Sequence, residues 1–312
     1  MESFDKWLEG FNPTEDYIKG FESGKSHAFS TSSKPTLIIG MGGSGIAGSI
    51  LSTFSPKNKK IYSVNDYYEI ESFHERVTGK YKPKKFLSNS KGWANLIFCS
   101  YSGNTEETLS WLKVASLTSF SITTGGKLAE SSSRKITMNH PGPPRRSIYE
   151  CLGILDGLTA KGNRFWDGQK PTQELIQKTI DTAKAWADEK VLPWMLVPAK
   201  CHPIARRWTG MIQEDAKIPA GFGIIPEAAH NQIEALGSNF LKTGLILIDA
   251  ESTKKENSKI LKVFEDKHTM MLPQIHPIQL CILGDYFAAS LAASLNIDMN
   301  AIPTIEKYKK IK

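Results

Sequence analysis

A glycine-rich turn between an apolar run and a stretch of small and apolar residues constrains the fold of this chain most strongly. The apolar run, TLII at residues 36–39, leads into GMGGSG at residues 40–45. This order predicts a buried strand, a loop of the size that holds a phosphate, and the start of a helix. Because backbone N–H groups point out of such a turn and a helix N-terminus carries partial positive charge, we expect the loop to bind a phosphate.

The same turn also satisfies the dinucleotide-binding pattern G-x-G-x-x-G through Gly40, Gly42 and Gly45. Asp66 ends the next apolar run, about twenty residues past Gly45, where the acid that binds the ribose of NAD is found. An NAD-dependent oxidoreductase is therefore one candidate function. The pattern is weakly specific by itself, so other parts of the chain must decide between this function and its alternatives.

Composition limits the class of protein. The 312 residues suffice for two domains, and no apolar stretch reaches the ~18 residues that span a membrane. The N-terminal sequence lacks a secretory signal pattern and the cysteines form no C-x-x-C pair, so we expect a cytoplasmic protein with reduced core cysteines and no metal cluster. The net charge of +7 is spread along the chain, which favours an anionic metabolite over nucleic acid as the partner.

Apolar runs separated by helical spacers predict an α/β fold with parallel, doubly wound sheets. In the first half we expect strands at residues 36–40, 60–64, 95–99, 119–123 and 135–139. In the second half we expect strands at residues 194–197, 222–225, 245–248 and 269–272. A proline-rich run at residues 141–144 separates the two halves. The predicted parts are a helical leader at 1–24, a first domain at 25–146 and a second domain at 147–312.

A second loop rich in hydroxyl groups changes the expected ligand. Ser100, Ser102 and Thr105 follow the strand predicted at residues 95–99. In a sheet of strand order 2-1-3-4-5, strands one and three are neighbours, and the loops after them flank the point where ligands bind. We therefore expect Ser44 of the first loop to face these hydroxyls and to form a site for one phosphate monoester. The alternative is that these side chains are ordinary helix caps and turn residues.

Three segments of the first half resemble the sugar isomerase (SIS) domains and, more narrowly, the bifunctional phosphoglucose/phosphomannose isomerases: residues 40–45 (GMGGSG), 100–108 (SYSGNTEET) and 122–126 (ITTGG). The resemblance continues at residues 144–145 (PR), 214–217 (EDAK), 226–231 (PEAAHN) and the lysine-rich C-terminus. It implies two flavodoxin-like SIS domains in tandem, a sugar 6-phosphate substrate that Gly42 and Gly43 help to bind, no cofactor, and a homodimer that shares its active sites between subunits.

The resemblance also implies catalytic roles. Aldose–ketose isomerisation moves a proton between C2 and C1 through an enediolate, and it needs a base, a group that opens the sugar ring and a cation for the oxyanion. By resemblance, Glu214 is the base, and His230 opens the ring in the active site of the partner subunit. Arg145, or its neighbour Arg146 in its place, stabilises the enediolate or positions the substrate, and Lys309 assists ring opening or binds oxygen. Lys307 and Lys310, both close to Lys309, are alternatives for the last role.

Several alternatives stay open. A SIS protein without catalytic activity, which binds a sugar phosphate and regulates a partner, is the main one. Glu227, His230 and Glu234 fall on one helical face and could suggest a metal site, although no second cluster accompanies them. The family often has a small hydroxylated residue where Ile302 stands, which leaves mannose 6-phosphate open as a second substrate besides glucose 6-phosphate. The polar segment at residues 77–94 has no assigned role.

Overall fold

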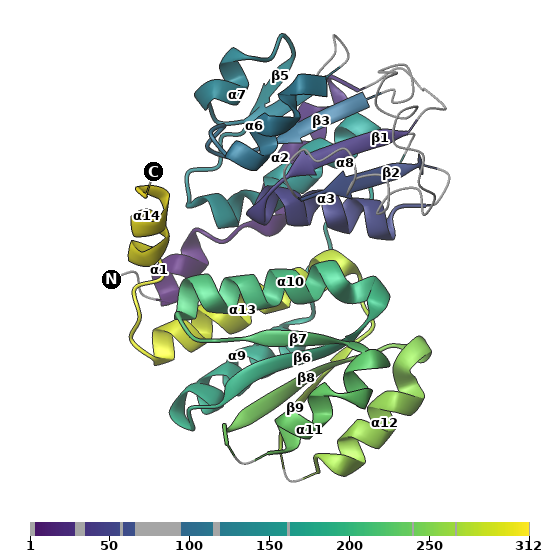
Figure 1. Cartoon of the computed structure of the whole chain (residues 1–312), viewed down its shortest axis with the longest axis vertical. Helices are drawn as coiled ribbons and strands as arrows, with labels where there is room; N and C mark the ends of the chain where they lie inside the picture. The colour runs from purple at the N-terminus through teal and green to yellow at the C-terminus, as the bar shows by residue number, and fades with distance from the viewer. Residues whose placement is uncertain are drawn as a thin grey trace. The chain divides into compact units, whose positions relative to one another are not determined.

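The computed structural model describes residues 4–28, 35–56, 59–65, 95–114, 119–160, 163–238, 240–265 and 267–311 (Figure 1). The chain divides into two compact units, which we call the N-terminal unit (Asn12–Gly168) and the C-terminal unit (Met1–Phe11 with Gln169–Lys312). Among the described residues, no helix is both long and apolar enough to cross a membrane.

The N-terminal unit is built on a parallel sheet of order β2-β1-β3-β4-β5, the order predicted from the sequence. Its strands are β1 (Thr36–Gly40), β2 (Ile61–Val64), β3 (Asn95–Cys99), β4 (Phe120–Thr123) and β5 (Lys135–Thr137). Every residue of β1 and β3 is buried, as expected for central strands covered on both faces. Leu37, Ile39 and Phe98 pack with Trp111 in one core cluster.

Helices of the N-terminal unit follow the strands as predicted. They are α2 (Pro13–Lys25), α3 (Gly42–Phe54), α6 (Glu106–Ser110), the 3-10 turn η2 (Trp111–Val114), α7 (Gly126–Glu130), the 3-10 turn η3 (Pro144–Ser147) and α8 (Ile148–Thr159). The expected leader divides at Pro13, because α1 (Phe4–Glu9) belongs to the C-terminal unit and α2 to the N-terminal unit. The units therefore divide after Gly168 instead of at the proline-rich run near residue 146.

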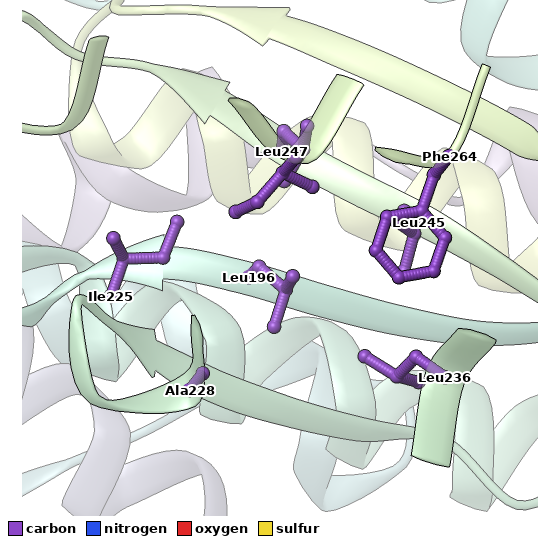
Figure 2. Close-up of a cluster of buried hydrophobic side chains, with 8 residues drawn as sticks. Leu196, Ile225, Ala228, Leu236, Leu245, Leu247 and Phe264 are labelled. Carbon is purple, nitrogen blue, oxygen red and sulfur yellow. The ribbon is translucent and has the colours of Figure 1, made fainter. Parts of the chain in front are cut away.

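The C-terminal unit holds a second parallel sheet, of order β7-β6-β8-β9, formed by β6 (Leu192–Pro198), β7 (Gly221–Ile225), β8 (Thr243–Asp249) and β9 (His268–Pro273). One face is covered by α11 (Gln232–Gly237) and α12 (Lys254–Val263), as Figure 1 shows. Leu196, Leu245 and Leu247 of the sheet pack there with Leu236 and Phe264 (Figure 2).

The other face of this sheet carries α9 (Gln173–Asp188), α10 (His202–Met211) and α13 (Pro277–Ser294) (Figure 1). Short elements complete the unit: η4 (Ala199–Cys201), the π-helical turn η5 (Ile212–Ala216), η6 (Glu227–His230), η7 (Glu251–Thr253) and α14 (Pro303–Lys309). Trp7 and Phe11 of the N-terminal segment pack edge-on against Tyr286 of α13, which explains why α1 joins this unit.

Two helices of the N-terminal unit, α2 and α8, touch through their backbones. A Cβ atom on Gly153 of α8 would overlap the carbonyl oxygen of Tyr17, and one on Gly20 of α2 would overlap the carbonyl oxygen of Glu150. The glycines therefore permit an approach that no other residue allows. This contact explains why α8 packs with the unit that precedes it, beyond the boundary predicted from the proline-rich run.

We predict that Gly153→Ala lowers the free energy of unfolding by about 2–3 kcal/mol, because the added methyl group forces two backbones apart. Gly210 in α10 is the matched control, since nothing lies within 4 Å of the position its Cβ would occupy. Gly210→Ala should keep or slightly raise stability by improving helix propensity. Urea unfolding followed by circular dichroism measures both variants, and equal losses would contradict the proposed backbone contact.

Candidate functional site

The first predicted phosphate loop joins β1 to α3. Met41 is extended, and Gly42 begins the helix with a φ of +53°, a left-handed conformation that favours glycine. A Cβ on Gly45 would overlap the carbonyl oxygen of Gly40, so the turn is tight. Ser44 lies in the first turn of α3 and is buried. The first N–H groups of a helix have no acceptor within it, which leaves this turn suited to an anion.

The second loop joins β3 to α6 and contains the three predicted hydroxyl residues. The hydroxyl oxygens of Ser100 and Thr105 lie 2.9 Å apart. The N–H of Gly103 donates to Oγ of Ser100 (3.1 Å), and the N–H of Asn104 donates to Oγ of Ser102 (3.3 Å). Ser100 and Ser102 thus order their own loop. Thr105 stands at the N-cap of α6 without a capping hydrogen bond from its side chain, and its hydroxyl pairs with Ser100 instead.

Strand register brings the two loops together. Gly40, the last residue of β1, pairs with Cys99, the last residue of β3. The chain therefore leaves the sheet at the same level in both places, and the first and second loops begin side by side at the carboxyl edge. The structure thus places the Ser44 loop next to the Ser100–Thr105 loop, as the predicted strand order required. Asp66, the ribose-binding candidate, lies outside the described residues.

A third loop, which the sequence indicated only by resemblance, supports the second. The N–H of Thr124 donates to the carbonyl oxygen of Tyr101 (2.9 Å), and the N–H of Leu128 donates to that of Gly103 (2.9 Å). Gly103 has a φ of +66°, and a Cβ there would overlap the carbonyl oxygen of Gly125. The third loop, after β4, therefore holds the backbone of the second loop in place.

Arg145 lies beside the first loop. It belongs to η3, and the position that a Cβ of Gly43 would occupy is 3.7 Å from the carbonyl oxygen of Pro144 and 3.8 Å from Cα of Arg145. Arg145 is buried, whereas Arg146 is half-buried. The structure therefore places the backbone of one predicted catalytic residue, Arg145, beside the predicted phosphate loop.

Glu214 lies in the π-helical turn η5, which follows α10 directly. Its side chain is half-buried, and its carbonyl oxygen accepts a hydrogen bond from Nζ of Lys217. Lys217 itself is left-handed, with a φ of +56°. Such π turns are frequent at functional sites because they change the direction of one side chain within a helix.

His230 and Lys309 are both exposed, at the C-terminal ends of η6 and α14. Nε2 of Gln213 donates to the carbonyl oxygen of Ala220 (2.8 Å), which ties the π turn that carries Glu214 to the amino end of β7. His230 follows the carboxyl end of β7. The strand has five residues, so about 13 Å separate its first and last Cα atoms. Within one chain, Glu214 and His230 therefore lie toward opposite edges of the sheet.

The alternative metal face lacks support in the described part of the chain. Oε1 of Glu227 accepts from Nδ2 of Asn231 (3.1 Å), and Glu234 is exposed. Among the described residues, no group of three or more His, Cys, Asp and Glu side chains is arranged to hold a metal ion.

Comparison with known proteins gives consistent matches. Residues 178–311 match the family model described as the bacterial phospho-glucose isomerase C-terminal SIS domain. The chain is 28% identical to a bifunctional phosphoglucose/phosphomannose isomerase of Aquifex aeolicus, over 99% of this chain and 98% of that protein. It is 26% identical to a D-glucosamine-6-phosphate 4-epimerase of Sulfolobus acidocaldarius, over 87% of each.

A solved structure has the same fold. Glucosamine-6-phosphate deaminase of Thermotoga maritima superimposes with a TM-score of 0.63 at 12% identity, over 95% of this chain and 97% of that one. This likeness and the two parallel sheets confirm the predicted fold class of two doubly wound α/β domains in tandem.

Proposed function

We propose that this chain, a relative of the bifunctional phosphoglucose/phosphomannose isomerases, is a cytoplasmic aldose–ketose isomerase that interconverts glucose 6-phosphate and fructose 6-phosphate without a cofactor. The observation that carries the proposal is the pairing of Gly40 with Cys99. It sets a helix N-terminus and a hydroxyl-rich loop side by side, which suits one phosphate monoester better than a dinucleotide.

In this proposal the sugar phosphate is held by the backbone at Gly42 and Gly43 and by the hydroxyls of the two loops. The carboxylate of Glu214 takes the proton from C2 of the open-chain aldose and returns it to C1, while the O1 and O2 oxygens exchange one proton. The guanidinium of Arg145 stabilises the negative charge of the enediolate. His230 and Lys309 exchange protons with the ring oxygen and O1 as the ring opens and closes.

The positions of the two proton-transfer residues support an active site shared between subunits. Glu214 and His230 flank opposite ends of β7 in one chain, so a hexose bound beside Glu214 is not expected to meet His230 of the same chain. We therefore propose a homodimer in which His230 enters the site of the other subunit.

A coupled assay tests the function. We expect the purified protein to convert fructose 6-phosphate into glucose 6-phosphate, detected by NADP reduction with glucose-6-phosphate dehydrogenase, and to do so equally with EDTA present. Mannose 6-phosphate should react more slowly, because Ile302 stands where the family often has a small hydroxylated residue.

Other results would identify the alternatives. Binding of sugar phosphate without conversion would indicate a regulatory sensor, and NAD reduction without the coupling enzyme would indicate an oxidoreductase. Production of an epimer of glucosamine 6-phosphate at C4 would place the chain with its epimerase relative instead.

A further inference from the structure

A set of hydrogen bonds fixes residues 139–142, the segment that leads into η3 and Arg145. The N–H groups of Asn139 and His140 donate to Oε1 and Oε2 of Glu150 (2.8 and 3.0 Å). The N–H of Gly142 donates to Nδ1 of His140 (3.0 Å). Position 141 is a proline, so every backbone N–H of this segment has an acceptor. The segment is therefore rigidly attached to the start of α8, the helix that contains Glu150.

Tyr101 connects this segment to the second phosphate loop. Its hydroxyl lies 3.1 Å from the carbonyl oxygen of His140 and 3.1 Å from that of Gly142, and it donates to this pair. Its own carbonyl oxygen accepts from the N–H of Thr124 (2.9 Å), so its backbone is fixed by the third loop. Tyr101 thus joins two parts of the site that are 39 residues or more apart in the chain.

The segment continues directly into the residue proposed to stabilise the enediolate. The N–H of Arg146 donates to the carbonyl oxygen of Pro143 (2.9 Å), and Oγ of Ser147 donates to that of Pro144 (2.7 Å). These bonds make η3 a tight turn, and Arg145 in its middle is buried, with its Cα beside Gly43. A displacement of residues 140–142 would therefore move Arg145 by a similar distance.

We propose that Tyr101 is a positioning residue for the reaction: its hydroxyl sets the distance between the second phosphate loop and Arg145. The inference rests on the proposed function. The phosphate loops fix the C6 end of the sugar, so Arg145 must meet the C1–C2 end at a set distance from them. Misplacement by about 1 Å of a group that acts in the transition state can cost about 10²-fold in rate.

The test is Tyr101→Phe, which removes only the hydroxyl, with Tyr62→Phe on β2 as a matched control in the same unit. We expect Tyr101→Phe to lower kcat about tenfold with less than a threefold change in KM, and Tyr62→Phe to change neither. In an Arg145→Lys background, Tyr101→Phe should change kcat less than twofold, because the group it positions is already altered. Multiplicative losses in the double variant would overturn the proposal.

Titration calorimetry with two probes makes the test independent of turnover. Inorganic phosphate reports on the phosphate loops, and arabinonate 5-phosphate adds a planar carboxylate that resembles the enediolate. We expect Tyr101→Phe to weaken arabinonate 5-phosphate about tenfold and inorganic phosphate less than twofold. Equal weakening of both probes would overturn the positioning role. A wild-type protein that binds both probes but converts no sugar phosphate would contradict the proposed function. The role of Tyr101 would still be decided by comparing how much Tyr101→Phe weakens the affinity for each probe.

Discussion

Glu214→Gln is expected to lower kcat about 10³-fold, with KM for fructose 6-phosphate changed less than threefold. The amide keeps the shape of the carboxylate but cannot accept the C2 proton. Substrate binding should persist, because the proposed phosphate loops do not include Glu214 and are unchanged by the substitution. The coupled assay gives kcat and KM. Proton exchange at C2 in deuterated water, followed by NMR, reports on the proton transfer itself and should be lost with the same factor.

Glu234→Gln is the matched control for this substitution. Glu234 is exposed on α11, in the same unit, and it has no proposed role in the proton transfer. The control should keep the wild-type kcat. A Glu214→Gln variant that retains more than a tenth of the wild-type rate would exclude Glu214 as the base and would direct the search to other carboxylates of the C-terminal unit.

The sequence predicted the architecture of the phosphate site because that site depends on local signals. Continuous apolar runs identify β1 and β3 as central strands, and the glycines of residues 40–45 permit a turn that few other residues allow. The strand order then follows from the doubly wound pattern and makes β1 and β3 neighbours, whereas the pairing of Gly40 with Cys99 is known from the structure alone.

The features that the sequence did not predict depend on tertiary packing or on hydrogen-bond register. The unit boundary after Gly168 arises from the glycine contact between α2 and α8, which joins residues distant in the chain. Likewise, α1 joins the C-terminal unit through the packing of Trp7 against Tyr286. The π turn at Glu214 changes the hydrogen-bond register of a helix without altering its apolar pattern, so periodicity alone predicts an uninterrupted helix.

The catalytic roles are predictions that come from resemblance to a family, whereas the phosphate loops were predicted from local sequence patterns. The structure places the backbone of Arg145 beside the first phosphate loop, and its role in the reaction stays a prediction. Glu214, His230 and Lys309 were assigned by resemblance, and single side chains of these types carry little signal in one sequence. The Tyr101 link also lacks a sequence signal, because it depends on carbonyl oxygens of residues 140 and 142 whose positions only the fold determines.

A buried ion pair holds α10, the helix that leads into the π turn with Glu214, and breaking it is expected to cost about 3–5 kcal/mol of unfolding free energy. Nε and Nη2 of Arg207 on α10 donate to Oδ1 and Oδ2 of Asp285 on α13 (both 2.9 Å), and both residues are at most 2% exposed. Asp285→Leu removes one partner and leaves the guanidinium charge buried without its carboxylate. Urea unfolding followed by tryptophan fluorescence measures the loss.

The double variant Arg207→Met with Asp285→Leu separates the cost of an unpaired charge from the cost of lost packing. Apolar side chains of similar volume need no desolvation, so the double variant should recover most of the stability that Asp285→Leu loses. Glu189→Gln is the control for an exposed pair, because Glu189 accepts a hydrogen bond from Lys242 at the surface, where solvent screens the interaction. The urea midpoint of this variant should equal that of the wild type. A double variant as unstable as Asp285→Leu would assign the loss to the shape of the α10–α13 contact. Recovery would assign the loss of stability to the buried, unpaired charge. The isomerase activity of the double variant would then show whether catalysis persists when apolar packing alone holds α10 in place.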